Sequence, residues 1–245
     1  MKPWPYPLWI AHRGAGKLAP ENTLAAFRLG AAHGYRAFEC DVKLAADEQA
    51  FLLHDATLER TSNGHGSAGS LGWAQLSRLD AGAWHGRAYA GEPLPTLEAI
   101  AAYVIANAFH LNIEIKPTPG LEARTGEVVA QRVRQLWAGQ AVPPLLSSFQ
   151  PQALAAARDA APELPRALLL DTLWDGWFGM AQALDCVAVV TNHQLMDAAL
   201  IAQLHGAGWR ALCYTVNDAA DAARLRALGI DGLITDAVDR FPPAA

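Results

Sequence analysis

The chain has 245 residues, of which 52% are hydrophobic and 18% are charged, a composition typical of a globular protein with ample apolar material for a core. Its formal net charge of −5 excludes long-range attraction to nucleic acids or anionic membranes, so we expect neither as a partner. No stretch approaches the roughly 18 consecutive apolar residues of a membrane span, and we expect no membrane insertion.

The cysteines and the first residues bear on the cellular compartment. Cys40, Cys186 and Cys213 stand far apart in apolar runs, which is typical of reduced core residues. Prolines alternate through residues 3–7 and oppose the helix of a signal peptide. These features predict a cytoplasmic protein. The sequence does not indicate its oligomeric state.

Short β-like runs alternate along the chain with helical stretches rich in Ala and Leu. The predicted strands cover residues 8–12, 37–43, 111–116, 145–149, 167–170, 187–191, 211–216 and 232–235. The predicted helices cover residues 22–33, 95–106, 121–137, 151–160, 195–206 and 218–227, while the interval between 170 and 187 gives only a weak helical pattern. Eight strands in parallel alternation with helices predict an α/β protein, a closed (β/α)8 TIM barrel made by one domain over residues 1–245.

Residues 51–54 form a further strand-like run that follows the second strand after only a tight turn. A parallel neighbour needs a crossover of about a dozen residues, so we expect an antiparallel hairpin. If the turn centres on Asp47 and Glu48, Asp41 lies opposite His54. Residues 56–94 then form a Gly-rich insertion, with one short helix expected at 72–79. Loops of this length inside a compact domain are usually functional, and we expect this one over the catalytic face.

Polar side chains stand where two of the predicted strands end. The first strand ends on His12 and Arg13, and the second carries Glu39 and Asp41, two residues apart and therefore on one face. In a TIM barrel the catalytic groups lie at the carboxyl ends of the strands. Such alternation also occurs in strands with one solvated face, but both faces of a parallel barrel strand are covered.

The strand at 111–116 repeats this pattern with Glu114 and Lys116. Three carboxylates that converge at one barrel mouth repel one another and raise each other's pKa values, which a bound divalent cation would relieve. Because the ligands are all oxygen atoms, the ion expected is Mg²⁺ or Ca²⁺, with Mn²⁺ as a further candidate. The sequence therefore predicts one divalent metal site.

The remaining polar residues suit a phosphodiester. Arg13 and Lys116 supply positive charge separate from the metal ligands. With three carboxylates and a divalent cation, the set carries a formal charge of +1, which a phosphodiester of charge −1 neutralises. His12 and His54 approach the same place, and two histidines on either side of a phosphate can serve as base and acid.

Several stretches carry a resemblance to a known family. The chain resembles glycerophosphodiester phosphodiesterases, close to their short cytoplasmic bacterial type. The stretches that carry this resemblance span nearly the whole chain in family order: AHRGAGKLAPENTLAAF, FECDVKLAADEQAFLLHDATLERTSNGHG, LPTLEAI, LNIEIKP, SSFQPQAL, YTVND and GIDGLITD. The resemblance implies an eight-stranded barrel, one divalent metal, and cleavage of small glycerophosphodiesters, such as glycerophosphocholine or glycerophosphoethanolamine, to sn-glycerol 3-phosphate and an alcohol.

The resemblance also implies residue roles, and it matches the family's insertion to residues 56–94. The implied sites are a catalytic histidine pair at His12 and His54, metal ligands at Glu39, Asp41 and Glu114, and phosphate-binding cations at Arg13 and Lys116. The chain departs from the family at the hairpin turn, where Thr-Lys-Asp-Gly is usual and residues 45–48 read Ala-Ala-Asp-Glu. At two further places we expect a structural role only: Asn22 or Thr23 caps a helix, and Asp236 caps a turn.

Other functions remain open at the level of sequence. A phospholipase D-like or cyclising lyase of the same barrel group would act on lysophospholipids by intramolecular attack. A barrel that only binds phosphodiesters is a non-catalytic alternative. Even for glycerophosphodiester cleavage, either the 2-hydroxyl of the substrate or a water molecule could attack the phosphorus.

Overall fold

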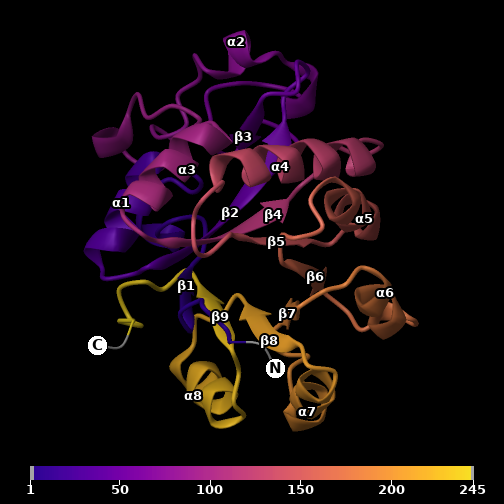
Figure 1. Ribbon diagram of the computed structural model, residues 1–245. Helices are drawn as coiled ribbons and strands as arrows, with labels where there is room; N and C mark the ends of the chain where they lie inside the picture. The colour runs from indigo at the N-terminus through magenta and orange to yellow at the C-terminus, as the bar shows by residue number, and fades with distance from the viewer. Residues whose placement is uncertain (1–2, 244–245) are drawn as a thin grey trace.

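A closed barrel of eight parallel strands forms the centre of the molecule, with helices around it (Figure 1). The computed structural model describes residues 3–243. The barrel strands are β1 (Trp9–Ala11), β2 (Ala37–Leu44), β4 (His110–Ile115), β5 (Leu145–Ser148), β6 (Arg166–Leu170), β7 (Ala188–Asn192), β8 (Arg210–Tyr214) and β9 (Gly232–Thr235). Their order is β1-β9-β8-β7-β6-β5-β4-β2, and a β1–β2 pairing closes the ring. The predicted TIM barrel is confirmed.

The helices follow the strands as the sequence pattern indicates. They are α1 (Leu24–Ala32), α3 (Leu97–Ala106), α4 (Glu122–Leu136), α5 (Pro151–Ala160), α6 (Trp177–Ala183), α7 (Ala198–Gly206) and α8 (Ala219–Ala227). Side-chain oxygens of Thr23, Thr96, Asp197 and Asp218 accept backbone N–H groups at four of their N-termini. Helix α6 occupies the interval in which the helical pattern was weak.

The barrel interior changes from apolar to polar along its axis. One set of inward-facing residues forms a buried apolar cluster, against which Trp4 and Tyr6 pack. Its members are Ile10, Ala37, Leu145, Ala167, Leu169, Ala188, Val190, Leu212 and Ile234. Towards the carboxyl ends of β2 and β4, acidic and amide side chains replace them, with Glu39 paired to Asn112 and Asp41 to Glu114. The intervening Cys40, by contrast, belongs to the outer core. This change of character places charged groups at one mouth of the barrel.

Strand β3 (Ala50–Leu52) pairs antiparallel with β2, which confirms the predicted hairpin. The expected register is wrong by one residue, because the Leu53 N–H donates to the Asp41 carbonyl at 3.1 Å and so lies opposite it. The reason is the turn, a three-residue loop between Ala45 and Gln49 rather than one centred between Asp47 and Glu48. Glu48 takes the left-handed conformation there (φ 62°), at the position where the family's usual sequence has Gly.

The hairpin tip and the insertion form one unit, which we call the hairpin–insertion lobe (residues 45–94); it projects at the top of Figure 1. It has a small core of its own, made by Ala45, Phe51, Leu53, Leu58, Ala68, Leu76, Ala81 and Leu94. The Asp47 carboxylate accepts the Trp73 N–H at 3.0 Å, where α2 (Trp73–Leu76) begins. Helix α2 is shorter than the expected 72–79. Two 3₁₀ turns, η2 (Ala68–Ser70) and η3 (Arg87–Tyr89), complete the lobe.

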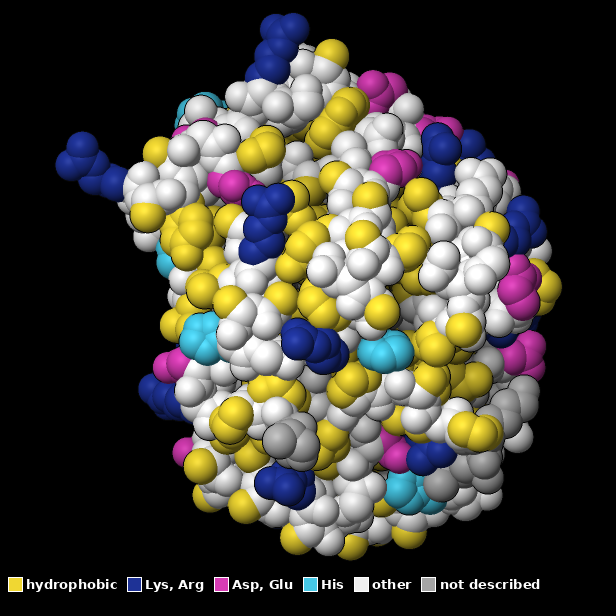
Figure 2. Space-filling view, turned by 60° about the vertical axis from the view of Figure 1, so that its left-hand side comes forward, with side chains coloured by type: hydrophobic (Ala, Val, Ile, Leu, Met, Phe, Trp, Pro, Cys, Tyr) yellow, Lys and Arg dark blue, Asp and Glu magenta, His cyan; other side chains and the backbone are white. Residues whose placement is uncertain are grey.

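The surface agrees with the charge of the sequence. On the face drawn in Figure 2, lysine and arginine side chains stand singly among apolar, acidic and uncharged atoms, without a broad basic patch. Within residues 3–243, every helix falls short of the length and apolar character required to cross a bilayer.

Candidate active site and metal site

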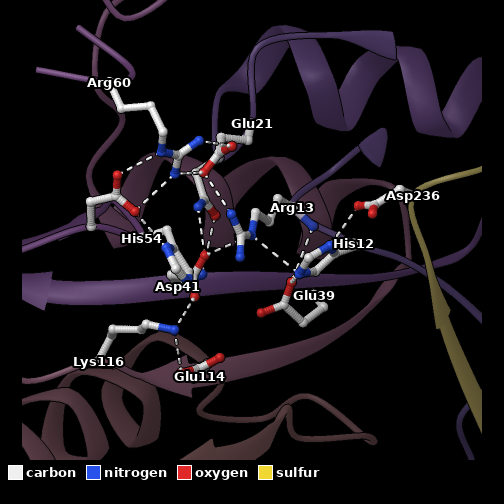
Figure 3. Close-up of polar contacts among 12 residues, drawn as sticks. His12, Arg13, Glu21, Glu39, Asp41, His54, Arg60, Glu114, Lys116 and Asp236 are labelled. Atoms are coloured by element: carbon white, nitrogen blue, oxygen red, sulfur yellow. Dashed lines mark hydrogen bonds and ion pairs between the residues drawn. The ribbon is translucent and has the colours of Figure 1, made fainter. Parts of the chain in front are cut away.

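Three buried carboxylates converge at the mouth of the barrel (Figure 3). Glu39 and Asp41 come from β2 and Glu114 comes from β4, and one carboxylate oxygen of each lies within 4.8 Å of the others. Parallel pairing of β2 and β4 sets Asp41 directly beside Glu114, which is why side chains distant in sequence meet here. Oxygen ligands at this spacing suit a hard divalent cation.

The electrostatics of this triad favour a cation. Burial and the charges of Asp41 and Glu114 raise the pKa of Glu39 well above its usual range. Burial and the charge of Asp41 raise the pKa of Glu114 to about 7. Burial acts in the same direction on Asp41, but Arg13 and Lys116 hold the pKa of that carboxyl below its usual value. A divalent ion at the triad would favour the ionised form of all three.

The two carboxylate oxygens of Asp41 differ, because Oδ2 accepts a hydrogen bond and Oδ1 does not. Its Oδ2 accepts the side-chain amide of Asn22 at 2.8 Å, and its own N–H donates to Asn22 Oδ1 at 3.1 Å. Asp41 Oδ1 is buried without a hydrogen bond, and Lys116 Nζ lies 3.4 Å from it. A buried carboxylate oxygen without a hydrogen bond fits a role as a metal ligand. Thr23 caps α1, so Asn22 orients Asp41 instead of capping the helix.

Arg13 and Lys116 lie against this acidic group. The Arg13 N–H donates to Glu39 at 3.1 Å, and its guanidinium lies 3.3 Å from Asp41. Lys116 Nζ donates to Glu114 Oε1 at 2.8 Å. Arg13 adopts the left-handed region (φ 52°), a strained conformation for a residue with a side chain, and such strain is concentrated at functional sites. Both cations border the same cavity as Glu39 and Glu114.

His12, at the end of β1, is oriented by a carboxylate from the opposite end of the chain. Its Nδ1 lies 2.6 Å from Asp236 Oδ1, and Asn217 donates to Asp236 Oδ2 at 3.0 Å. The Arg13 Nε–H donates to His12 Nε2 at 3.1 Å. With Asp236 accepting from Nδ1–H, the Nε2 atom is the ring nitrogen turned towards the site, where it accepts the Arg13 N–H. The expected capping role of Asp236 is wrong, because Thr235 Oγ1 accepts the N–H of that turn.

His54 follows β3 and is oriented in the same way from within the hairpin–insertion lobe. Its Nδ1 lies 2.7 Å from Asp55 Oδ1. Arg60 holds Asp55 through two hydrogen bonds and also bonds to Glu21, which in turn holds Arg13. Burial, together with Arg13 and Lys116, lowers the pKa of His54, so its neutral form is favoured at neutral pH. The lobe is thus tied to the barrel by charge pairs.

A cavity of about 230 Å³ joins these groups. Its walls include both histidines, Glu39, Glu114, Arg13 and Lys116, together with Phe149 and Tyr214. Asn112 Oδ1 and Ser147 Oγ also border it, and both atoms are buried without a hydrogen-bond partner within the described residues. Buried polar atoms of this kind require a partner, which an ion's hydration shell or a substrate hydroxyl would provide.

All seven residues predicted from the sequence therefore lie at one mouth, and the sequence did not reveal the part that several further residues play there. Asn22, Asp55, Arg60 and Asp236 act through contacts that only the fold creates. Lys43 could have been predicted, because it continues the alternation of inward-facing residues along β2 after Glu39 and Asp41. It is buried and donates to the Lys116 carbonyl at 3.2 Å. Burial and the charge of Lys116 lower its pKa to about 8.

Comparisons with known proteins place this geometry in a family. Residues 12–240 match the model of the glycerophosphoryl diester phosphodiesterase family. A glycerophosphodiester phosphodiesterase of Caldanaerobacter subterraneus subsp. tengcongensis is 32% identical, over 94% of this chain and 93% of that protein. A phosphodiesterase structure from Oleispira antarctica, in complex with the product sn-glycerol-3-phosphate, has a TM-score of 0.91 and 34% identity over 96% of this chain and 95% of the other. The chain therefore belongs to the glycerophosphoryl diester phosphodiesterase family and is a phosphoric diester hydrolase.

Proposed function

We propose that this enzyme hydrolyses small glycerophosphodiesters, such as glycerophosphocholine and glycerophosphoethanolamine, to sn-glycerol 3-phosphate and an alcohol in a reaction that depends on a divalent cation. In this proposal Glu39, Asp41 and Glu114 hold Mg²⁺ or Ca²⁺, with Mn²⁺ as a third possibility. Arg13 and Lys116 bind the phosphate, and His12 and His54 form the acid–base pair.

The observation that carries this proposal is that two members of the acidic triad, Glu39 and Glu114, line one cavity together with two histidines that carboxylates orient. Acidic triads alone are common on protein surfaces, but these three are buried. The product bound to the Oleispira antarctica relative supports a glycerol phosphate ligand of this kind. The buried atoms Asn112 Oδ1 and Ser147 Oγ are suited to hydroxyl groups of such a ligand.

Each group has a chemical task in this scheme. The cation, when bound, would withdraw charge from the phosphoryl oxygens. The N–H groups of Arg13 and Lys116 would bind the phosphate and stabilise the charge that builds up on it. One imidazole, in its neutral form, takes the proton of the attacking hydroxyl at Nε2, and the other, in its protonated form, donates its Nε2 proton to the departing alcohol oxygen. Asp236 and Asp55 hold the two rings so that each presents Nε2 for these transfers.

The nucleophile is either the substrate's own 2-hydroxyl or a water molecule. Attack by the 2-hydroxyl would release the alcohol first and leave a cyclic glycerophosphate, which water then opens. Phosphorus NMR of the reaction at early times distinguishes the two routes, because only the first gives a cyclic phosphate signal before sn-glycerol 3-phosphate.

The function is tested by the release of sn-glycerol 3-phosphate from glycerophosphocholine, with and without EDTA. We expect release that EDTA abolishes and that Mg²⁺, Ca²⁺ or Mn²⁺ restores, with lysophosphatidylcholine cleaved far more slowly. Cleavage that EDTA leaves unchanged would contradict the metal dependence, and faster cleavage of lysophosphatidylcholine would contradict the substrate class.

Two further properties belong to the proposal. We propose that residues 1–245 form a single domain of this family, including its insertion, because the family model spans residues 12–240 without interruption. We also propose that the enzyme acts in the cytoplasm as a small-molecule hydrolase, since Cys40, Cys186 and Cys213 are all free and buried.

A further inference from the structure

A second cavity, of about 390 Å³, lies beside the catalytic one and shares His12 and Arg13 with it. Its wall comes from two parts of the chain that are distant in sequence. Gly16 and Lys17, in the turn after β1, form one side, and Trp84 and His85 of the hairpin–insertion lobe form the other. A ligand whose phosphate lies at Arg13 could therefore extend into both cavities.

The two sides of this second cavity are joined by direct contacts. His85 Nε2 lies 3.1 Å from the Lys17 carbonyl oxygen, and the Tyr89 hydroxyl donates to the Leu18 carbonyl at 3.4 Å. Gly16 lies so close to the backbone of Asp236 that a Cβ at this position would be 2.1 Å from the Asp236 carbonyl oxygen. The turn after β1 is thereby fixed against β9, so the wall is built from restrained segments.

Building on the proposed function, we propose that this second cavity binds the alcohol part of the substrate and favours an uncharged polyol over a quaternary ammonium group. Trp84 is 41% exposed at the cavity, and its indole N–H is already bonded to the Ala81 carbonyl at 2.8 Å. An exposed aromatic ring beside hydrogen-bonding side chains suits the C–H and O–H groups of a polyol.

The charges of the lining support this choice. Glu21 binds Arg13 and Arg60, and Asp236 binds His12, so both carboxylates are already engaged. Lys17 lines the cavity and has no ion-pair partner among residues 3–243. The lining has three basic side chains, Arg13, Lys17 and Arg60, against these two carboxylates, so its formal charge is positive without any contribution from histidine, which disfavours a trimethylammonium group. Recognition of such a group also requires several aromatic faces around it, and the cavity lining contains one tryptophan.

Three substrates and three variants test the assignment. The substrates are glycerophosphoglycerol, glycerophosphocholine, and the methyl ester of sn-glycerol 3-phosphate, which has almost no alcohol part. For Trp84→Ala we expect kcat/KM to fall about fivefold to tenfold for glycerophosphoglycerol and less than about twofold for the methyl ester. The matched control is Trp174→Ala, which removes a tryptophan of similar exposure (38%) that borders neither cavity.

Lys17→Glu tests the charge argument without risk to folding, because the side chain is exposed and unpaired in the described structure. We expect it to raise kcat/KM for glycerophosphocholine relative to glycerophosphoglycerol by about fivefold. The assignment is overturned if both Trp84→Ala and Lys17→Glu leave the substrate ratios of the wild type unchanged, as Trp174→Ala should. A wild-type enzyme that cleaves none of the three substrates would instead overturn the proposed function itself.

Discussion

The barrel mouth and the hairpin–insertion lobe contribute to the same site by different means. The barrel supplies Glu39, Asp41 and Glu114 from hydrogen-bonded strands, where neighbouring strands fix each side chain. The lobe supplies His54 from the segment that follows a three-residue strand, and this segment rests on a separate, smaller core. Under the proposed function, the barrel would therefore determine whether a cation is held, and the lobe would determine whether the second histidine is in position.

The strongest way to separate the two regions is to remove one histidine from each. We expect His12→Ala and His54→Ala each to lower kcat by about 10²- to 10⁴-fold, because in the proposed mechanism each ring carries one proton transfer. Circular dichroism and a divalent-cation titration should match the wild type for both variants. Near-normal turnover by either variant would exclude that ring from the reaction.

Substitution of Asp55 tests whether the lobe orients His54 for the reaction. We expect Asp55→Asn to lower kcat by about 10- to 100-fold, because the carboxylate that orients His54 is lost. The hydrogen bond to Asp55 raises the pKa of His54, in opposition to burial. Its removal should therefore move one limb of the pH–rate profile to lower pH. An unchanged profile would indicate that Asp55 serves only to hold Arg60.

Substitution of Asn22 tests whether the barrel mouth orients Asp41 for cation binding. Its two hydrogen bonds fix Asp41, so we expect Asn22→Ala to raise the divalent-cation concentration needed for half-maximal activity by about tenfold. At saturating cation, kcat should recover most of its wild-type value. A loss of kcat that no cation concentration restores would place Asn22 in the chemical step instead.

The smallest effect should come from the hairpin tip. Asp47→Ala removes the acceptor for the N–H at the start of α2, which we expect to cost about 1 kcal/mol of stability in the lobe. Thermal unfolding and kcat measure the two consequences, and we expect kcat to stay within about twofold of wild type, because Asp47 does not line the cavity. A loss of activity comparable to that of His54→Ala would show instead that the position of His54 depends on the structure of the hairpin tip.

The division between the regions also explains how much the sequence predicted. Strand alternation identified Glu39, Asp41, Glu114 and Lys116, because a period of two assigns each residue to a face once the strand is recognised. The same pattern includes Lys43, which was overlooked. Asp236 follows the last barrel strand and therefore lies at the catalytic mouth, but its partner His12 is 224 residues away in sequence.

The lobe was harder to predict, for a physical reason. Its hairpin register depends on the loop conformation, which the left-handed Glu48 determines, and this produced the one-residue error opposite Asp41. Asp55 and Arg60 form an ion pair that also includes Glu21 of the barrel. Trp84 borders a cavity that exists only after the lobe has packed on the turn after β1. Such contacts have no periodic pattern in the sequence.

The most direct test of this account is a calorimetric titration of the metal-free protein with Mn²⁺, comparing the wild type, Asp41→Asn and His54→Ala. We predict that wild type and His54→Ala bind one equivalent with the same affinity, and that Asp41→Asn binds at least about tenfold more weakly. The account is contradicted if Asp41→Asn binds the ion as the wild type does, or if His54→Ala loses binding.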